Sequence, residues 1–212
     1  MALAMLAAVA GDASARIGDA PEQMSARILQ PDLGKNFSWP KDMNEKERAR
    51  QEKENPVNAF AYLLPTSPEE WRTQIFWKSA VKTHLSNENG WRIHVHFMGG
   101  RSVLELYRRV GESLSDAEVN AILARMRGAE TWRKVERKDN VSSVVGYDFE
   151  LGEEAHPTLR ARKLGDWLMI FPVRFDVYLV ERKKRWDDSE AVRKEAVRKT
   201  QAELAPQSVE GF

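Results

Sequence analysis

Two histidines separated by one residue, His94 and His96, are the side chains best placed for chemistry. They lie in a segment in which apolar and polar residues alternate. Residues two apart on a strand share a face, so two imidazoles could bind one metal ion. A metal-dependent hydrolase would need a third ligand, and the other histidines are His84 and His156. Because no carboxylate motif accompanies the pair, we favour a solvent-facing strand surface over a metal site.

A second candidate is an anion site at a predicted helix start. It is formed by Gly99, Gly100, Arg101 and Ser102. Backbone N–H groups at the start of a helix can hold an anion, to which the arginine would add charge. The segment lacks the glycine spacing of a nucleotide site, and a tight turn before a capped helix explains each residue.

A third candidate is a basic patch beside two tryptophans. Its residues are Arg133, Lys134, Arg182, Lys183, Lys184 and Arg185. Such clusters suit phosphate backbones, so a nucleic-acid-associated protein is one alternative. Acidic residues interleave with the basic ones, however, which favours a solvated, salt-bridged surface.

The composition and the absence of motifs exclude several kinds of chemistry. The formal net charge is +1 and there are no cysteines, which excludes disulfides and thiolate chemistry. No nucleotide fingerprint or hydrolase motif occurs, so we predict a non-catalytic protein without a cofactor.

The amino terminus resembles an export signal. A short apolar run is followed by Ala13-Ser14-Ala15, the pattern of a cleavage site, although no basic residue precedes the run. We therefore expect residues 1–15 to be removed and the protein to be periplasmic or extracellular. If they are not a signal, a cytoplasmic location follows.

Residues 16–59 are expected to form a polar arm. Several prolines and glycines interrupt this segment, and its stretch 43–54 is helix-permissive but polar on every face. Phe37 and Trp39 are its large aromatic anchors, and we expect them to hold the arm against the domain.

The core is expected over residues 60–186. Residues 71–85 fit either a helix after a Ser-Pro-Glu-Glu start signal or a strand, and residues 91–98 alternate as a half-buried strand. Residues 103–110 and 116–126 each follow a capping-box pattern and predict a pair of helices packed on a sheet.

The second half of the core is predicted to be β-rich. Residues 159–164 and 167–171 read as a hairpin around Gly165-Asp166, and residues 175–180 as an interior strand. Residues 187–212 form a charged, helix-prone tail with few apolar positions.

Together these elements predict an α+β fold. An antiparallel sheet is covered on one face by a short helix pair, with a polar amino-terminal arm and a charged helical extension at the carboxyl terminus. Extensions that bury nothing of their own commonly contact other proteins. We therefore expect an exported binding or structural protein that acts through a protein partner or self-association.

Overall fold

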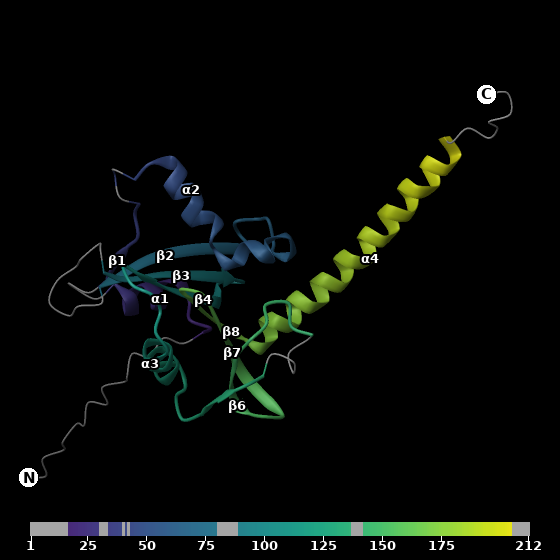
Figure 1. Cartoon of the computed structure of the whole chain (residues 1–212). Coiled ribbons are helices and arrows are strands. Elements are labelled where there is room, and N and C mark those ends of the chain that lie inside the picture. Colours follow the sequence, from purple (N-terminus) through teal and green to yellow (C-terminus); the bar gives the residue numbers. More distant parts are fainter. Residues whose placement is uncertain are drawn as a thin grey trace, which may run out of the picture.

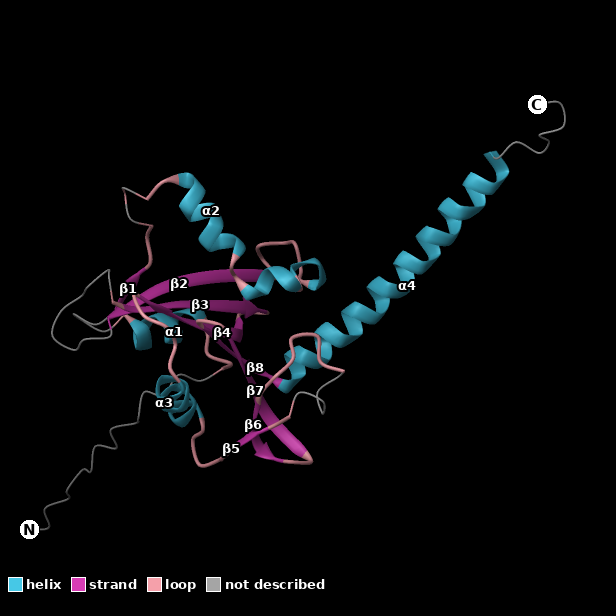
Figure 2. Ribbon diagram, in the orientation of Figure 1, coloured by secondary structure: helices cyan, strands magenta, loops and turns pink. Residues whose placement is uncertain are grey.

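The computed structural model consists of one antiparallel sheet, helices against it and a long projecting helix (Figures 1 and 2). It describes residues 17–29, 34–39, 41, 43–79, 89–136 and 142–204. The predicted α+β class with an antiparallel sheet is therefore confirmed. The expected export signal lies outside the described residues.

The sheet has eight strands. They are β1 (Gly34–Asn36), β2 (Trp71–Ser79), β3 (Gly90–Met98), β4 (Arg101–Val110), β5 (Trp132–Lys134), β6 (Phe149–Glu153), β7 (His156–Leu164) and β8 (Trp167–Pro172). The helices are α1 (Pro21–Ile28), α2 (Glu45–Lys53), α3 (Asp116–Met126) and α4 (Val173–Leu204), with two 3₁₀ turns, η1 (Pro56–Ala59) and η2 (Ala61–Leu63).

The strand order is β1-β2-β3-β4-β8-β7-β6-β5. Strands β2 to β4 form one meander and strands β5 to β8 form another, and all pairs are antiparallel. The two meanders join through β4 and β8, where Glu105 lies opposite Ile170. Both of these strands are therefore central and covered on both faces.

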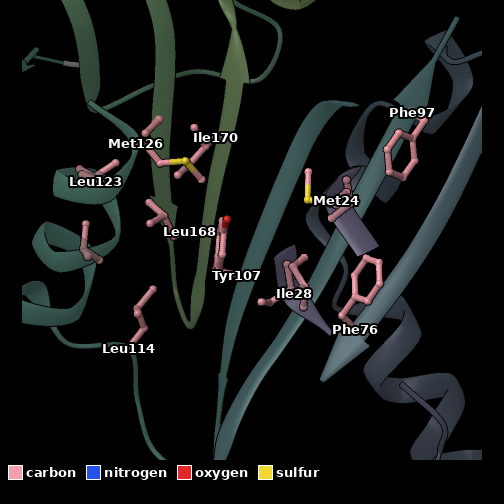
Figure 3. Packing of buried hydrophobic residues seen from close by; sticks show 14 residues of the cluster. Met24, Ile28, Phe76, Phe97, Tyr107, Leu114, Leu123, Met126, Leu168 and Ile170 are labelled. Carbon is pink, nitrogen blue, oxygen red and sulfur yellow. The ribbon is translucent and has the colours of Figure 1, made fainter. Parts of the chain in front are cut away.

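One face of the sheet packs against α1 and α3. Met24 of α1 is fully buried beside Phe76 of β2, while Leu123 and Met126 of α3 lie near Ile170 of β8 (Figure 3). The helix α3 begins at the predicted capping box, in which Ser115 and Glu118 bond reciprocally. The second of the two predicted helices, residues 116–126, is thus present as α3.

The opposite face packs against the 3₁₀ turns and the start of α4. Phe60, Leu63 and Phe175 are buried there, together with Phe171 of β8. Two parts of the predicted arm, α1 and η1, therefore contribute side chains to the two cores. The proposed division into arm, core and tail remains a prediction.

The predicted helix pair is not present, because Arg101–Val110 is strand β4. Val103, Leu104, Leu106 and Tyr107 are all buried, on both faces of the sheet. A strand covered on both faces loses the alternation of apolar and polar residues, so its apolar positions also fit a helical period.

Two further elements correct the expected secondary structure. Residues Trp71–Ser79 form β2, which agrees with the strand alternative and not with a helix. Residues 175–180, predicted as a strand, form the first turns of α4, in which Phe175 and Leu179 are buried while Val177 is 49% exposed. That one-sided burial is helical. The predicted hairpin around Gly165 is confirmed by β7 and β8.

The start of α4 is fixed by a buried ion pair. The Asp176 carboxylate is inaccessible to solvent, and its oxygens lie 2.5 Å from Arg160 Nη1 and 2.8 Å from Ser143 Oγ. Breaking a buried pair leaves an uncompensated charge, so this contact anchors the helix to β7.

Beyond its first turns, α4 leaves the body of the protein (Figure 1). None of the helices in the described ranges is long and apolar enough to cross a membrane.

Candidate binding site

The two histidines lie in the interior, so the expectation of a solvent-facing surface is wrong. His94 is 6% exposed and His96 is 3% exposed. The face that carries them is covered by the segment from α2 to η2 and by α4. His96 stacks on Trp71 with ring centroids 5.0 Å apart, and its Nδ1 lies 2.9 Å from Thr73 Oγ1.

Burial keeps both imidazoles neutral. Desolvation lowers the pKa of His96 to about 3, and desolvation together with the charges of Arg92 and Arg108 lowers that of His94 to about 2. Their Nε2 atoms make no hydrogen bond. Neutral imidazole suits a metal ion, yet no group of three or more metal-ligating side chains occurs within the described part of the chain.

The other proposed ligands do not join the pair. His156 lies at the start of β7 and is exposed, while His84 falls outside the described residues. The metal site therefore stays a two-histidine prediction without a located third ligand.

A row of four large side chains crosses the sheet beside the histidines. Trp77 of β2 is paired with Arg92 of β3, which is paired with Arg108 of β4. Arg108 is paired in turn with Trp167 of β8. The two arginines are direct cross-strand neighbours, an arrangement in which like charges repel. Contacts with other side chains must therefore offset this repulsion.

Arg92 is enclosed by aromatic rings. It is only 3% exposed, and its guanidinium carbon lies 5.4 Å from the ring centroid of Phe37, 5.0 Å from that of Trp39 and 5.6 Å from that of Trp167. Cation–π attraction compensates part of the lost hydration. The two arm aromatics thus clamp residues 34–39 to the sheet through this arginine.

The hydrogen bonding of Arg92 is incomplete. Its Nη1 donates to Gln51 Oε1 of α2 over 3.0 Å, but its Nε makes no hydrogen bond. Desolvation, reinforced by the charge of Arg108, lowers the pKa of Arg92 to about 10.

Arg108 is bound by the segment that follows α2. Its Nη2 lies 2.8 Å from the Glu54 carboxylate, whereas its buried Nη1 has no hydrogen-bond partner. Just beyond Glu54, the amide of Asn55 lies 3.4 Å from His94 Nδ1. The site is thus an arginine pair with unused donors beneath a polar helix, and it suits an anion.

The predicted anion site at residues 99–102 has a different structure. Gly99 and Gly100 adopt φ of 59° and 72° and form the tight turn between β3 and β4. Arg101 and Ser102 begin a strand, so the helix start on which the prediction rested is absent. Ser102 instead pairs through its backbone with Gly18 and Asp19.

The predicted basic patch divides into two places. Arg133 pairs with Glu150 and Glu154 beside Lys134, in a groove of about 700 Å³ on β5 to β7. The other four residues lie on α4, where Arg182 donates to the Leu63 carbonyl and Lys183 pairs with Asp187, while Lys184 and Arg185 are exposed.

The sequence analysis missed the arginine pair. Arg92 lies in the alternating segment 91–98 but was not considered as a site residue, and Arg108 fell in a segment predicted as a helix. The available signal was an arginine inside an alternating strand, at the position where aromatic residues of the arm could enclose it.

Neither a protein-family model, nor a curated protein, nor a solved structure matches this chain.

Proposed function

We propose that this protein is a non-catalytic binding or structural protein that acts through protein–protein contacts at the cell envelope or exterior, with α4 reaching the partner. The observation that supports this is the length of α4 that remains uncovered. Phe175 and Leu179 are buried, and Trp186, which is 44% exposed, packs edge-on against Tyr62 with ring centroids 5.2 Å apart. Beyond it Val197 is 51% and Val192 71% exposed. At about 1.5 Å per residue, the portion after Trp186 would span about 27 Å.

The exposed part of α4 combines charge with a line of apolar residues. Neighbouring turns are linked by the ion pairs Lys183–Asp187, Glu190–Arg193 and Glu195–Arg198, which support a helix in solvent. Phe175, Trp186 and Val197 are spaced eleven residues apart, about three helical turns, so they lie along one side. The side that packs on the core thus continues outward as an exposed contact surface.

A photo-crosslinking residue tests this surface. Placed at Val197, it is expected to form an adduct with a partner or a second copy in the native host. Placed at Val192, which lies away from the line, it should form at least about tenfold less. Equal adduct yields at both positions would argue against a directed contact surface.

Removal of residues 189–212 separates binding from folding. Because the hydrogen bonds and ion pairs of residues 189–202 lie within α4 itself, we expect the free energy of unfolding to change by no more than about 0.5 kcal/mol, while co-purification of the partner identified by the crosslink at Val197 is lost. Thermal unfolding measures the first effect. A large loss of stability would mean that the segment belongs to the folded core.

Export is tested by the mass of the protein from its native host. The Ala13-Ser14-Ala15 pattern predicts a mature chain that begins at Arg16. Recovery of the uncleaved chain from the cytoplasm would contradict the proposed location without affecting the proposed role of α4.

A further inference from the structure

We propose that the Arg92–Arg108 pair is a binding site for an acidic segment of a partner protein, and that Gln51 of α2 and Glu54, the residue that follows α2, occupy this site in the free protein. This site is separate from α4 and goes beyond the function proposed above.

The first argument is the charge balance of the site. Two guanidinium groups lie side by side on β3 and β4, and the ion pair they make is the one between Arg108 and Glu54. Arg92 reaches only the neutral amide of Gln51. Arg92 is buried and Arg108 is partly buried, and among the described residues one carboxylate is ion-paired with these two guanidinium groups, so a further anion would be favourable.

Two other arginines in the same protein show that this deficit is specific. Arg109 is 6% exposed, and its guanidinium pairs with Glu112 and Glu118. Arg160 pairs with Glu150 and Asp176. Each of these arginines reaches two carboxylates, whereas the pair on β3 and β4 shares one.

The second argument is that α2 is a cover that can be displaced. None of its residues is buried, and its capping and ion-pair contacts are largely internal to the helix. It is held over the sheet by the bonds of Gln51 and Glu54 to the arginines and by Arg48 above Trp39. A short helix without a buried apolar face gains little stability from packing, so exchanging these polar contacts for contacts with a ligand costs little free energy.

The third argument identifies the occupant. The group already bound to Arg108 is a peptide carboxylate, that of Glu54, at 2.8 Å. Arg92 Nε and Arg108 Nη1 remain as buried donors without partners. Guanidinium groups bind carboxylates through two parallel bonds, and a segment with two or more acidic side chains would offer a carboxylate to each arginine, whereas in the described part of the free protein Arg108 alone of the two has one. An acidic peptide thus satisfies donors that the cover leaves unsatisfied.

A fluorescently labelled hexaglutamate peptide is a suitable probe, with binding followed by fluorescence anisotropy on the full chain. The double variant Gln51→Ala/Glu54→Gln removes the competing side chains and is expected to bind the peptide about tenfold more tightly than the unaltered protein. Adding Arg108→Gln to this variant should weaken binding by about tenfold or more.

The matched control is Glu45→Gln. Glu45 is exposed in the first turn of the same helix, and within the described residues no hydrogen bond or ion pair joins it to Gln51 or to either arginine. This variant therefore changes the net charge in the same direction as Glu54→Gln without uncovering the arginines, and its affinity should equal that of the unaltered protein. Equal affinities for Glu45→Gln and Gln51→Ala/Glu54→Gln would overturn the proposal.

Two further measurements complete the test. If Arg108→Gln fails to fold, Arg108→Lys keeps the charge but removes the paired donors, and an unchanged affinity in that variant would also overturn the proposal. Inorganic phosphate should displace the peptide only at much higher concentration. Displacement at the same concentration would show a small-oxyanion site and overturn the assignment to an acidic segment.

Discussion

Between about pH 7.5 and about pH 4.5, the two buried histidines are expected to lower the free energy of unfolding by about 5 kcal/mol. Their pKa values in the folded protein, about 2 for His94 and about 3 for His96, lie far below the ordinary value of 6.5. Below about pH 6.5 the unfolded chain therefore binds protons that the folded protein excludes, and stability falls as the pH falls. Two pH units at about 1.4 kcal/mol each give roughly 2–3 kcal/mol per histidine.

The carboxyl group of Glu105 acts in the opposite direction. It is inaccessible to solvent, and burial raises its pKa, while Tyr107 donates to it over 2.5 Å. The folded protein therefore holds this proton above the pKa of the unfolded chain, and stability rises as the pH falls through that window. The contribution of the histidines must be measured as a difference between variants that all retain Glu105.

Chemical denaturation across this pH range provides the measurement. The double variant His94→Gln/His96→Gln removes both titrating groups and should remove the decrease of about 5 kcal/mol that they cause in the free energy of unfolding. Each single variant should remove about half of that decrease. His156→Gln is the control, because His156 is exposed on β7. If the double variant and the unaltered protein lose the same stability between pH 7.5 and 4.5, the histidines are not buried as described.

The second large effect is expected from Phe97→Ala, which should lower the free energy of unfolding by about 3–5 kcal/mol. Phe97 is 2% exposed and belongs to the core that includes Met24, Phe76 and Val95. Loss of the buried ring removes the free energy of its burial and leaves a cavity. Because the sheet is covered on both faces, its strands cannot easily move to fill that cavity. This cost would be a large part of a typical total stability of about 5–15 kcal/mol.

Val192→Ala provides the comparison for Phe97→Ala. It also truncates an apolar side chain, but at a position that is 71% exposed, and should change the free energy of unfolding by less than about 0.5 kcal/mol. Equal, small effects from the two substitutions would contradict the placement of β3. His96→Ala is not a neutral comparison, because the opposite face of β3 is also buried.

The parts of the fold predicted correctly are those that carry a strong local signal in the sequence. Trp91 to Met98 alternates because one set of side chains is polar, and the residues around Gly165 form a two-residue turn. Helix α3 shows both a cap and an apolar stripe. In each case the local sequence contains enough information, because the element is shaped by contacts within a few residues or by one face of the core.

The errors come from burial that the local sequence does not record. Strand β4 is central, so its apolar residues on two faces imitate a helix, while the β-branched start of α4 imitates a strand. The polar face of β3 was expected in solvent because arginine and histidine rarely fill a core. Here distant residues of the arm, Phe37, Trp39 and Asn55, cover that face.

The candidate site was unpredictable for the same reason. Arg92 and Arg108 are sixteen residues apart in the chain, and only the register of β3 with β4 makes them neighbours. The histidine pair could be found from its spacing, but its neutrality depends on a cover that comes from another part of the sequence.

The join between the two meanders also sets the order in which the chain can fold. Strands β2 to β4 pair with sequence neighbours, as do β5 to β8, so hairpins can form early in each half. The contact of Glu105 with Ile170 must close a loop of 65 residues, which contains α3, and the entropy of that closure is lost before its contacts form. Folding speed should therefore depend on the β4–β8 join more than on either meander, and a chain interrupted before this join would expose two unpaired strand edges to other molecules.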